Sequence, residues 1–250
     1  MAAKDPPVGV WEDAEQALRK LRVFKQTLAL CMEFEGRRTK TMFVDLHVHE
    51  RAFSLDSEMT LAQIVARARE MGMGGVCVTD HDSLGIREEA ARYSREVNFP
   101  IFVGVEVLTV QGDIVAFGSP YAFQPRTIDA QEFINYVHCN GGACFSAHPF
   151  RNNQRGLEEH LAALRGLDGV EVLNGSTTLE ANRTALEYAQ KYGIQPLGAS
   201  DAHCLSQLGK YVTWMPEEPK DLESFIRALR SGTCRPAIWE DGAFRVVDTF

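Results

Sequence analysis

The sequence has no closely spaced cysteines. Its six cysteines lie far apart in a chain of 250 residues, and none belongs to a C-x-x-C pair. This distribution gives no disulfide framework, and Cys77 and Cys144 lie inside apolar runs that are typical of buried strands. We therefore expect reduced thiols that serve as small apolar residues in a cytoplasmic protein.

Long apolar runs and an excess of positive charge are also missing. No apolar run is long enough to cross a bilayer, and the N-terminal segment MAAKDPPVGVWEDAEQ carries charges where a secretory signal needs an apolar core. Lys and Arg number 26 against 34 Asp and Glu, for a formal net charge of −8. Sequence-independent binding to long nucleic acid depends on clustered basic side chains that neutralise phosphates. We therefore expect no membrane partner and no long nucleic acid, although a metal-lined pocket can still bind one phosphate.

What is present is the composition of a folded α/β protein. With 45% hydrophobic and 24% charged residues, the chain can bury a large core and form one main domain. Apolar, strand-like runs alternate with helical patterns along most of it. We expect a tail and an amphipathic helix over residues 1–41, the main domain over 42–235, and a C-terminal segment over 236–250 whose structure the pattern does not assign.

The N-terminal helix carries one apolar stripe. Apolar residues recur at three- and four-residue steps from Trp11 to Phe34. Such a stripe must be buried, either against the protein's own main domain or in a contact between two copies of the chain. A homodimer through this helix is therefore one of two interpretations.

Five apolar runs each end at a histidine or an acidic residue. The run MFVDLHVH ends in His47 and His49, and the later runs lead to further polar side chains: His81, Glu106, His148, Asp201 and His203. In a (β/α) barrel all parallel strands present their C-terminal ends to the same face. A single histidine at such an end is more often packed or solvated than a ligand. Five of the seven histidines occupy strand ends, so we expect them to converge, whereas His138 and His160 fall in helical patterns.

This set of donors predicts a site for several metal ions. Imidazole and carboxylate groups without thiolate suit zinc, manganese or iron, and with Asp56 from the first loop the set exceeds what one ion needs. Two or three divalent ions, with Glu106 as a bridging ligand, account for it. Such ions activate water and hold a phosphoryl oxygen, although hydrolysis at a carbonyl uses the same parts. Arg151 is either a clamp for an anionic phosphate or a solvated surface side chain.

Five short motifs occur in order along the chain: DLHVH (45–49), TDHD (79–82), GVE (104–106), AHP (147–149) and SDAH (200–203). Together they resemble the PHP superfamily, which is named for bacterial polymerases and histidinol phosphatases. Each motif alone is common, but the ordered set is specific, and the similarity spans roughly residues 42–235. The resemblance implies a distorted (β/α)7 TIM-like barrel with a metal-dependent phosphoesterase centre.

The resemblance also implies how the ions are held. One ion is expected on His47, His49, Glu106 and Asp201, a second on Asp56, His81 and His203, and a third on Glu106, His148 and a histidine of the hairpin after the glutamate. This hairpin has Asp113 and no histidine, so Asp113 is either an oxygen ligand or a turn residue. The flanking Asp80 and Asp82 are expected to orient the ring of His81.

We predict a metal-dependent hydrolase of phosphate esters that acts on a small phosphomonoester or a nucleotide-sized substrate. Glu106, Asp201 and Arg151 are the expected catalytic residues, and no protein nucleophile is required. One alternative is an exonuclease that trims short oligonucleotides, as some PHP relatives do. The other is a metal-stabilised barrel without catalysis that binds a partner through its N-terminal helix.

Overall fold

The computed structural model describes residues 41–248. The strands are β1 (Met42–Asp45), β2 (Gly75–Val78), β3 (Ile101–Leu108), β4 (Asp113–Phe117), β5 (Ala143–Ser146), β6 (Gly169–Asn174), β7 (Pro196–Ala199), β8 (Tyr211–Met215), β9 (Arg235–Glu240) and β10 (Ala243–Val246). The helices are α2 (Leu61–Glu70), α3 (Arg87–Val97), α4 (Ala130–Cys139), α5 (Leu179–Tyr192), α6 (Leu222–Arg230) and the 3₁₀ helix η1 (Glu158–Ala162). The predicted helix from Trp11 to Phe34 lies outside the described residues, so its packing and any subunit contact stay predictions.

All ten strands form one sheet in the order β10-β9-β8-β1-β2-β3-β4-β5-β6-β7. Parallel pairing joins β1 to β2, β2 to β3, β5 to β6 and β6 to β7, as alternating strands and helices require. The hairpin predicted after Glu106 is present, and it makes β4 antiparallel to both β3 and β5. Strands β8, β9 and β10 are also antiparallel to their neighbours. The α/β class is therefore confirmed, but the sheet is mixed and departs from a regular (β/α)7 repeat.

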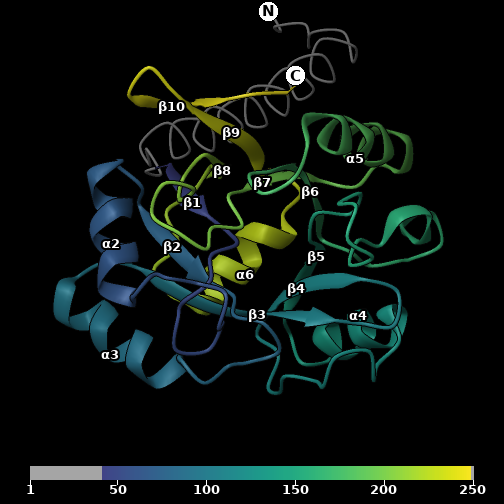
Figure 1. Ribbon diagram of the computed structural model, residues 1–250, viewed down its shortest axis with the longest axis horizontal. Coiled ribbons are helices and arrows are strands. Elements are labelled where there is room, and N and C mark those ends of the chain that lie inside the picture. Colours follow the sequence, from purple (N-terminus) through teal and green to yellow (C-terminus); the bar gives the residue numbers. More distant parts are fainter. Residues whose placement is uncertain (1–40, 249–250) are drawn as a thin grey trace, which may run out of the picture. The chain divides into compact units, whose positions relative to one another are not determined.

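The sheet curls into a half-barrel, and its curvature brings β7 next to β8 and β9 (Figure 1). Just past the end of β1, Val48 forms an isolated parallel bridge with Ala202, and His49 N donates to Ala202 O at 3.1 Å. Nearer the start of β7, the Thr213 hydroxyl accepts from Gly198 N at 3.1 Å and donates to Gly198 O at 2.8 Å. The ends of β1 and β7 are thereby held side by side, which matters for the site below.

Helix α6 packs on the interior of the curled sheet, while α2, α3, α4 and α5 lie around its outside (Figure 1). Phe225 of α6 is fully buried, with its ring stacked on Phe102 of β3 at 4.3 Å between centroids and edge-on to Phe117 of β4 at 4.9 Å. Asp221 caps this helix and accepts from Ser224 N at 2.7 Å. One end of the interior is thus filled with apolar side chains, which leaves polar side chains for the other end.

The C-terminal residues that the sequence pattern did not assign form β9 and β10. Strand β9 pairs with β8 from Arg235 to Ile238 and therefore extends the sheet. Within residues 41–248, no helix has both the length and the apolar character needed to span a bilayer.

Candidate metal centre

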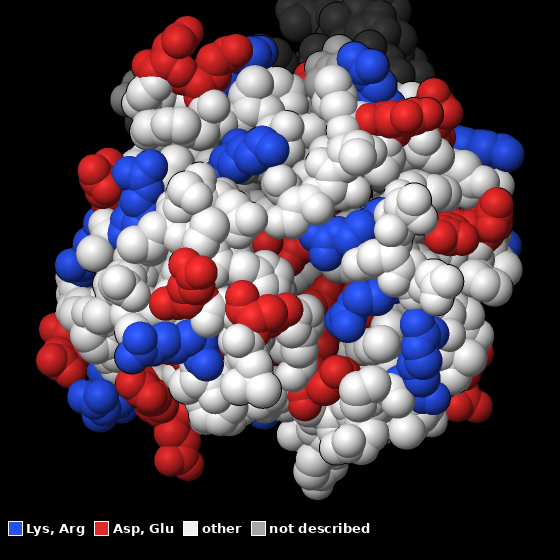
Figure 2. Space-filling view, viewed as in Figure 1, with Lys and Arg blue, Asp and Glu red and all other residues white. Residues whose placement is uncertain are grey.

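The strand ends bring the predicted side chains to one place. His47 and His49 follow β1, His81 follows β2, Glu106 lies in β3, His148 follows β5, and Asp201 and His203 follow β7. Figure 2 shows a hollow on this face with acidic side chains inside it and basic side chains along one rim. At the centre, His47, His49 and Glu106 are fully buried, and His148 and Asp201 are 1% exposed.

The first group of side chains surrounds the two histidines of β1. His47 Nε2 and His49 Nε2 lie 3.0 Å apart, and Glu106 Oε1 lies 3.5 Å from His47 Nε2. Asp201 Oδ1 is 3.3 Å from His49 Nε2 and 3.7 Å from His47 Nε2. Four ligand atoms that converge at such distances are what a divalent cation would bring together.

A second group lies closer to solvent. His81, His203 and His49 place ring nitrogens within 4.8 Å of one another. Asp56 Oδ2 lies 3.3 Å from both His81 Nε2 and His203 Nε2, and the Asp56 side chain is 59% exposed. The early-loop aspartate therefore lies beside the two histidines with which the resemblance to the PHP superfamily grouped it.

The third group is built around Asp113, the first residue of β4. Glu106, Asp113 and His148 are buried together, with His148 Nε2 at 2.9 Å from Glu106 Oε1 and 3.6 Å from Asp113 Oδ2. Arg155, which sequence reasoning did not single out, lies against Asp113: its Nε is 2.7 Å from Oδ2, and its Nη2 is 3.1 Å from Oδ1. Asp113 is thus a buried, ion-paired residue and not merely a turn residue.

The charges in this centre are strongly coupled. Burial opposes ionisation of Asp201 and Glu106, but the nearby His47 and other cationic neighbours outweigh it and hold both pKa values well below their usual range. Burial likewise lowers the pKa of His49, to about 4. For His81, the Glu106 carboxylate overcomes the effect of burial and raises the pKa to about 9. In the metal-free protein, the positive charge of protonated histidines such as His81 therefore offsets the negative charge of the ionised Glu106 and Asp201 carboxylates.

The buried Oδ1 oxygen of Asp201 has no hydrogen-bond partner. Asp201 Oδ1 is buried and accepts no hydrogen bond, although imidazole nitrogens of His47, His49 and His203 lie 3.3–3.7 Å away. Burial of an ionised carboxylate oxygen is costly unless it is paired or binds a metal. The residues present therefore fit a divalent ion at this position.

Glu171 of β6 is a buried residue of the site that sequence reasoning missed. Its Oε1 lies 2.8 Å from His47 Nδ1, and its Oε2 accepts from His148 N at 2.8 Å and from Asn174 Nδ2 at 2.7 Å. A carboxylate behind a histidine fixes which ring nitrogen carries the proton and turns the other toward the metal. Glu171 therefore orients His47 so that Nε2 faces the first group.

The aspartates beside His81 act differently from the prediction. Asp80 Oδ1 accepts from Ser54 Oγ at 2.9 Å, and this hydroxyl lies 3.1 Å from His49 Nδ1. Asp82 Oδ1 accepts from Leu108 N at 3.1 Å. Asp80 thus supports His49 through Ser54, and Asp82 fastens its own turn to β3.

Arg151 is directed into the site and is not a solvated surface side chain. Its guanidinium forms an ion pair with Asp201, and Nη2 donates to Ser176 O at 3.1 Å. The side chain remains 19% exposed. It is therefore fixed in place and still within reach of a bound anion.

Three residues of the site have a left-handed backbone conformation. Asp82, His148 and Asp201 have φ values of +47°, +25° and +51°, a region that residues with a Cβ seldom adopt. Such conformations cost about 1–3 kcal/mol each and persist where the surroundings impose them, as at active sites.

Another cluster of potential ligands, formed by His138, Cys144 and Asp168, has a structural explanation. Asp168 Oδ2 accepts from Cys144 N at 2.9 Å and lies 2.9 Å from His138 Nε2. Burial raises the pKa of the Cys144 thiol well above its usual value, which disfavours the thiolate that a metal needs. These contacts fasten α4 to the starts of β5 and β6.

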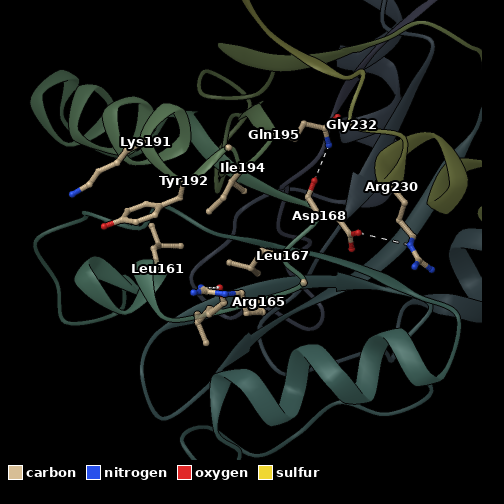
Figure 3. A pocket seen from close by; sticks show the side chains of 13 residues that line it. Leu161, Arg165, Leu167, Asp168, Lys191, Tyr192, Ile194, Gln195, Arg230 and Gly232 are labelled. Atoms are coloured by element: carbon tan, nitrogen blue, oxygen red, sulfur yellow. Dashed lines mark hydrogen bonds and ion pairs between the residues drawn. The ribbon is translucent and has the colours of Figure 1, made fainter.

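A cavity of about 580 Å³ lies at the opposite ends of the strands, where Asp168 precedes β6 and Gln195 precedes β7. Asp168 and Gln195, two of its polar residues, already have partners in the protein (Figure 3). Asp168 Oδ1 lies 3.7 Å from Arg230 Nε, and Gln195 Nε2 donates to Asp168 O at 2.8 Å. The histidine-lined end is therefore the better candidate for chemistry.

Comparison with known proteins agrees with this geometry. The sequence profile of the PHP domain matches residues 45–197, and a PHP-associated profile matches residues 180–234. An uncharacterized protein of Methanocaldococcus jannaschii is 28% identical over 207 residues, which cover 77% of this chain and 81% of that protein.

Two solved structures illustrate the similarity in fold. A two-domain protein of Bacteroides vulgatus, described as containing a predicted PHP-like metal-dependent phosphoesterase, has a TM-score of 0.63 and 18% identity, over 79% of this chain and 65% of that one. The lesion-specific endonuclease Q of Pyrococcus furiosus has a TM-score of 0.61 and 15% identity, over 79% of this chain and 58% of that one.

Proposed function

The chain belongs to the PHP domain family, and on this premise we propose that it is a metal-dependent phosphoesterase for small phosphate esters. The observation that carries the proposal is the convergence of five histidines, Glu106 and Asp201, with the buried Asp201 Oδ1 left without a hydrogen bond. On this proposal the curled sheet is a distorted (β/α)7 barrel whose polar end is the active site.

The residues that would hold the ions fall into the first two groups. His47, His49, Glu106 and Asp201 would hold one ion, and His81, His203 and Asp56 would hold another. Their nitrogen and oxygen donors suit manganese, zinc or iron. Ions bound in this way supply an activated water near neutral pH and offset charge on phosphoryl oxygens.

The chain's own side chains prepare the site for an anion. Glu171 and Asp80 hold His47 and His49 in fixed orientations, so the donor atoms need little rearrangement. Arg151, fixed beside Asp201, presents a guanidinium that matches the oxygens of a phosphate monoester. We assign Arg151 to binding the transferred phosphoryl group.

The charge around the hollow supports a small substrate. Acidic and basic side chains are interspersed over this face, and the net charge of the chain is −8 (Figure 2). A long polyanion would gain little from such a surface, whereas a single phosphate gains from the ions and from Arg151. A phosphomonoester or a nucleotide-sized substrate is therefore favoured over an oligonucleotide.

The test is hydrolysis by the full chain loaded with Mn²⁺. We expect phosphate release from aryl phosphates or mononucleotides, its loss with a chelator, and a loss of more than about 100-fold in Asp201→Asn, because even the orienting partners of metal ligands account for 10–100-fold. The matched control is Asp241→Asn, which makes the same chemical change at an exposed turn and should keep full activity.

Other results would redirect the proposal. Shortening of oligonucleotides without release of phosphate from small esters would support the exonuclease alternative. A metal-loaded protein that hydrolyses none of these substrates but binds a partner would support the non-catalytic alternative.

A further inference from the structure

The third group of side chains already contains a cation supplied by the protein. Asp113 is fully buried, and the Arg155 guanidinium donates hydrogen bonds to both oxygens of its carboxylate, at 2.7 Å and 3.1 Å. The same guanidinium lies 4.0 Å from Glu106 Oε2 and 3.4 Å from His81 Nδ1. Arg155 therefore places its charge between the two buried carboxylates of this group.

An ion and Arg155 would need the same oxygens. A divalent ion on Glu106, Asp113 and His148 would use an Asp113 oxygen that now accepts a short, charge-assisted hydrogen bond from Arg155. Two cations side by side would also repel each other at close range. Because guanidinium stays protonated in proteins, Arg155 cannot lose its charge to make room for an ion.

The protein holds Arg155 in this position through its backbone. Asp113 N donates to Arg155 O at 2.7 Å, so the loop after β5 and the β3–β4 hairpin are joined at the two residues that form the ion pair. Gly112 and Gly156 allow this approach, since a Cβ on Gly112 would lie 2.6 Å from the carbonyl carbon of Gly156. The contact is thus built into the packing of two loops.

We propose that Arg155 takes the place of a divalent ion beside Glu106, Asp113 and His148, so that the chain binds two ions and carries a fixed guanidinium in this third position. The inference rests on the metal centre of the proposed function. Arg155 would then compensate the negative charge of the buried Glu106 and Asp113 carboxylates. Because 30% of the Arg155 side chain is exposed, its guanidinium also remains accessible to a bound anion.

The test is the number of ions bound per chain, measured by elemental analysis after equilibrium dialysis against excess Mn²⁺. We expect two ions in the parent protein and three in Arg155→Met and Arg155→Gln, which vacate the carboxylates. Arg155→Lys keeps a positive charge and should stay at two, and Asp113→Asn added to Arg155→Met should return the count to two. The matched control is Arg126→Met, because Arg126 Nη2 donates to Gln154 O at 2.8 Å and supports the same loop without touching a carboxylate of the site.

The outcomes separate this inference from the proposed function. Three ions in the parent protein would overturn the inference whatever the variants do. Two ions in the parent and still two in folded Arg155→Met and Arg155→Gln would overturn it while leaving the two-ion hydrolase intact. No bound ion in the parent would remove both proposals.

Discussion

Glu171→Gln tests whether the buried carboxylate behind His47 controls metal binding. Both oxygens of Glu171 accept hydrogen bonds: Oε1 faces His47 Nδ1, and Oε2 faces His148 N and Asn174 Nδ2. A glutamine has the same shape but can accept on one side only. Its oxygen should turn to the two fixed donors, and its amino group should then face His47 Nδ1. In the neutral imidazole that a metal requires, this would force the His47 proton onto Nε2, the nitrogen that faces the first group.

The expected magnitude follows from this tautomer change. A histidine protonated on its ligating nitrogen cannot bind a metal until the proton moves, and loss of such orienting partners typically lowers metal affinity by about 10–100-fold. At room temperature this corresponds to roughly 1.4–2.7 kcal/mol of binding free energy. The metal-free protein should also lose about 1–3 kcal/mol of stability, because the charge-assisted hydrogen bond between Glu171 and the His47 ring is lost.

The assay is a metal titration against a competing chelator, combined with ¹⁵N spectra of the histidine side chains to report the His47 tautomer. Glu180→Gln is the matched control, since it makes the same change on the exposed face of α5 and should leave affinity and tautomer unaltered. An affinity within twofold of the parent, with the proton of His47 still on Nδ1, would refute the reasoning.

Two further predictions concern stability and pH. Thr213→Val removes the hydroxyl of β8 that hydrogen-bonds to both Gly198 N and Gly198 O of β7. We expect the free energy of unfolding, measured by urea denaturation, to fall by about 1–3 kcal/mol. An unchanged midpoint would show that the curl of the sheet does not depend on these hydrogen bonds. Burial alone would lower the pKa of His81, but Glu106 and Asp56 raise it to about 9 in the metal-free protein, so below this pH a proton must leave before the nitrogen binds an ion. Metal affinity should therefore fall as pH falls from about 9 to 6, by up to about tenfold per pH unit for each proton displaced. Calorimetry in buffers of different ionisation enthalpy measures the number of protons released on binding. A metal affinity that does not change with pH would contradict the role of His81 as a ligand.

The parts of the fold that local pattern could predict are those set by a single segment. The run MFVDLHVH is apolar except for Asp45 until it reaches its histidines, and β1 is a largely buried strand there. Thr60 and Gln63 form the capping box that begins α2, as the residue types favour. By contrast, Pro236 interrupts the apolar pattern near the C-terminus, and a proline within a run argues against a strand. Strand β9 forms nevertheless because pairing with β8 along Arg235–Ile238 overrides the local preference.

Some residues of the candidate site could likewise be predicted from a single segment, and others could not. The predicted ligands lie together because each stands at the end of its own strand, a position that sequence reveals. Glu171 left a weaker signal, a charged residue within the apolar run Gly169–Asn174, and charged residues are seldom fully buried unless paired. Alternation along a strand allowed that side chain to face solvent equally well. Only the position of β6 next to β5 and β7 shows that it points at His47.

Asp113 shows where sequence reasoning reached its limit. The pattern offered two roles, an oxygen ligand or a turn residue, and the structure gives a third, because its partner Arg155 comes from a loop 42 residues away. Burial, followed by the charge of Glu106, raises the pKa of Asp113 to about 7 although His148 and Arg155 oppose this rise, so ionisation of this carboxyl would be still less favourable without a cation beside it. Whether that cation is a metal or a guanidinium depends on the loop after β5 and not on the histidine motifs. Chains that share every histidine of this centre can therefore differ in the number of ions they hold.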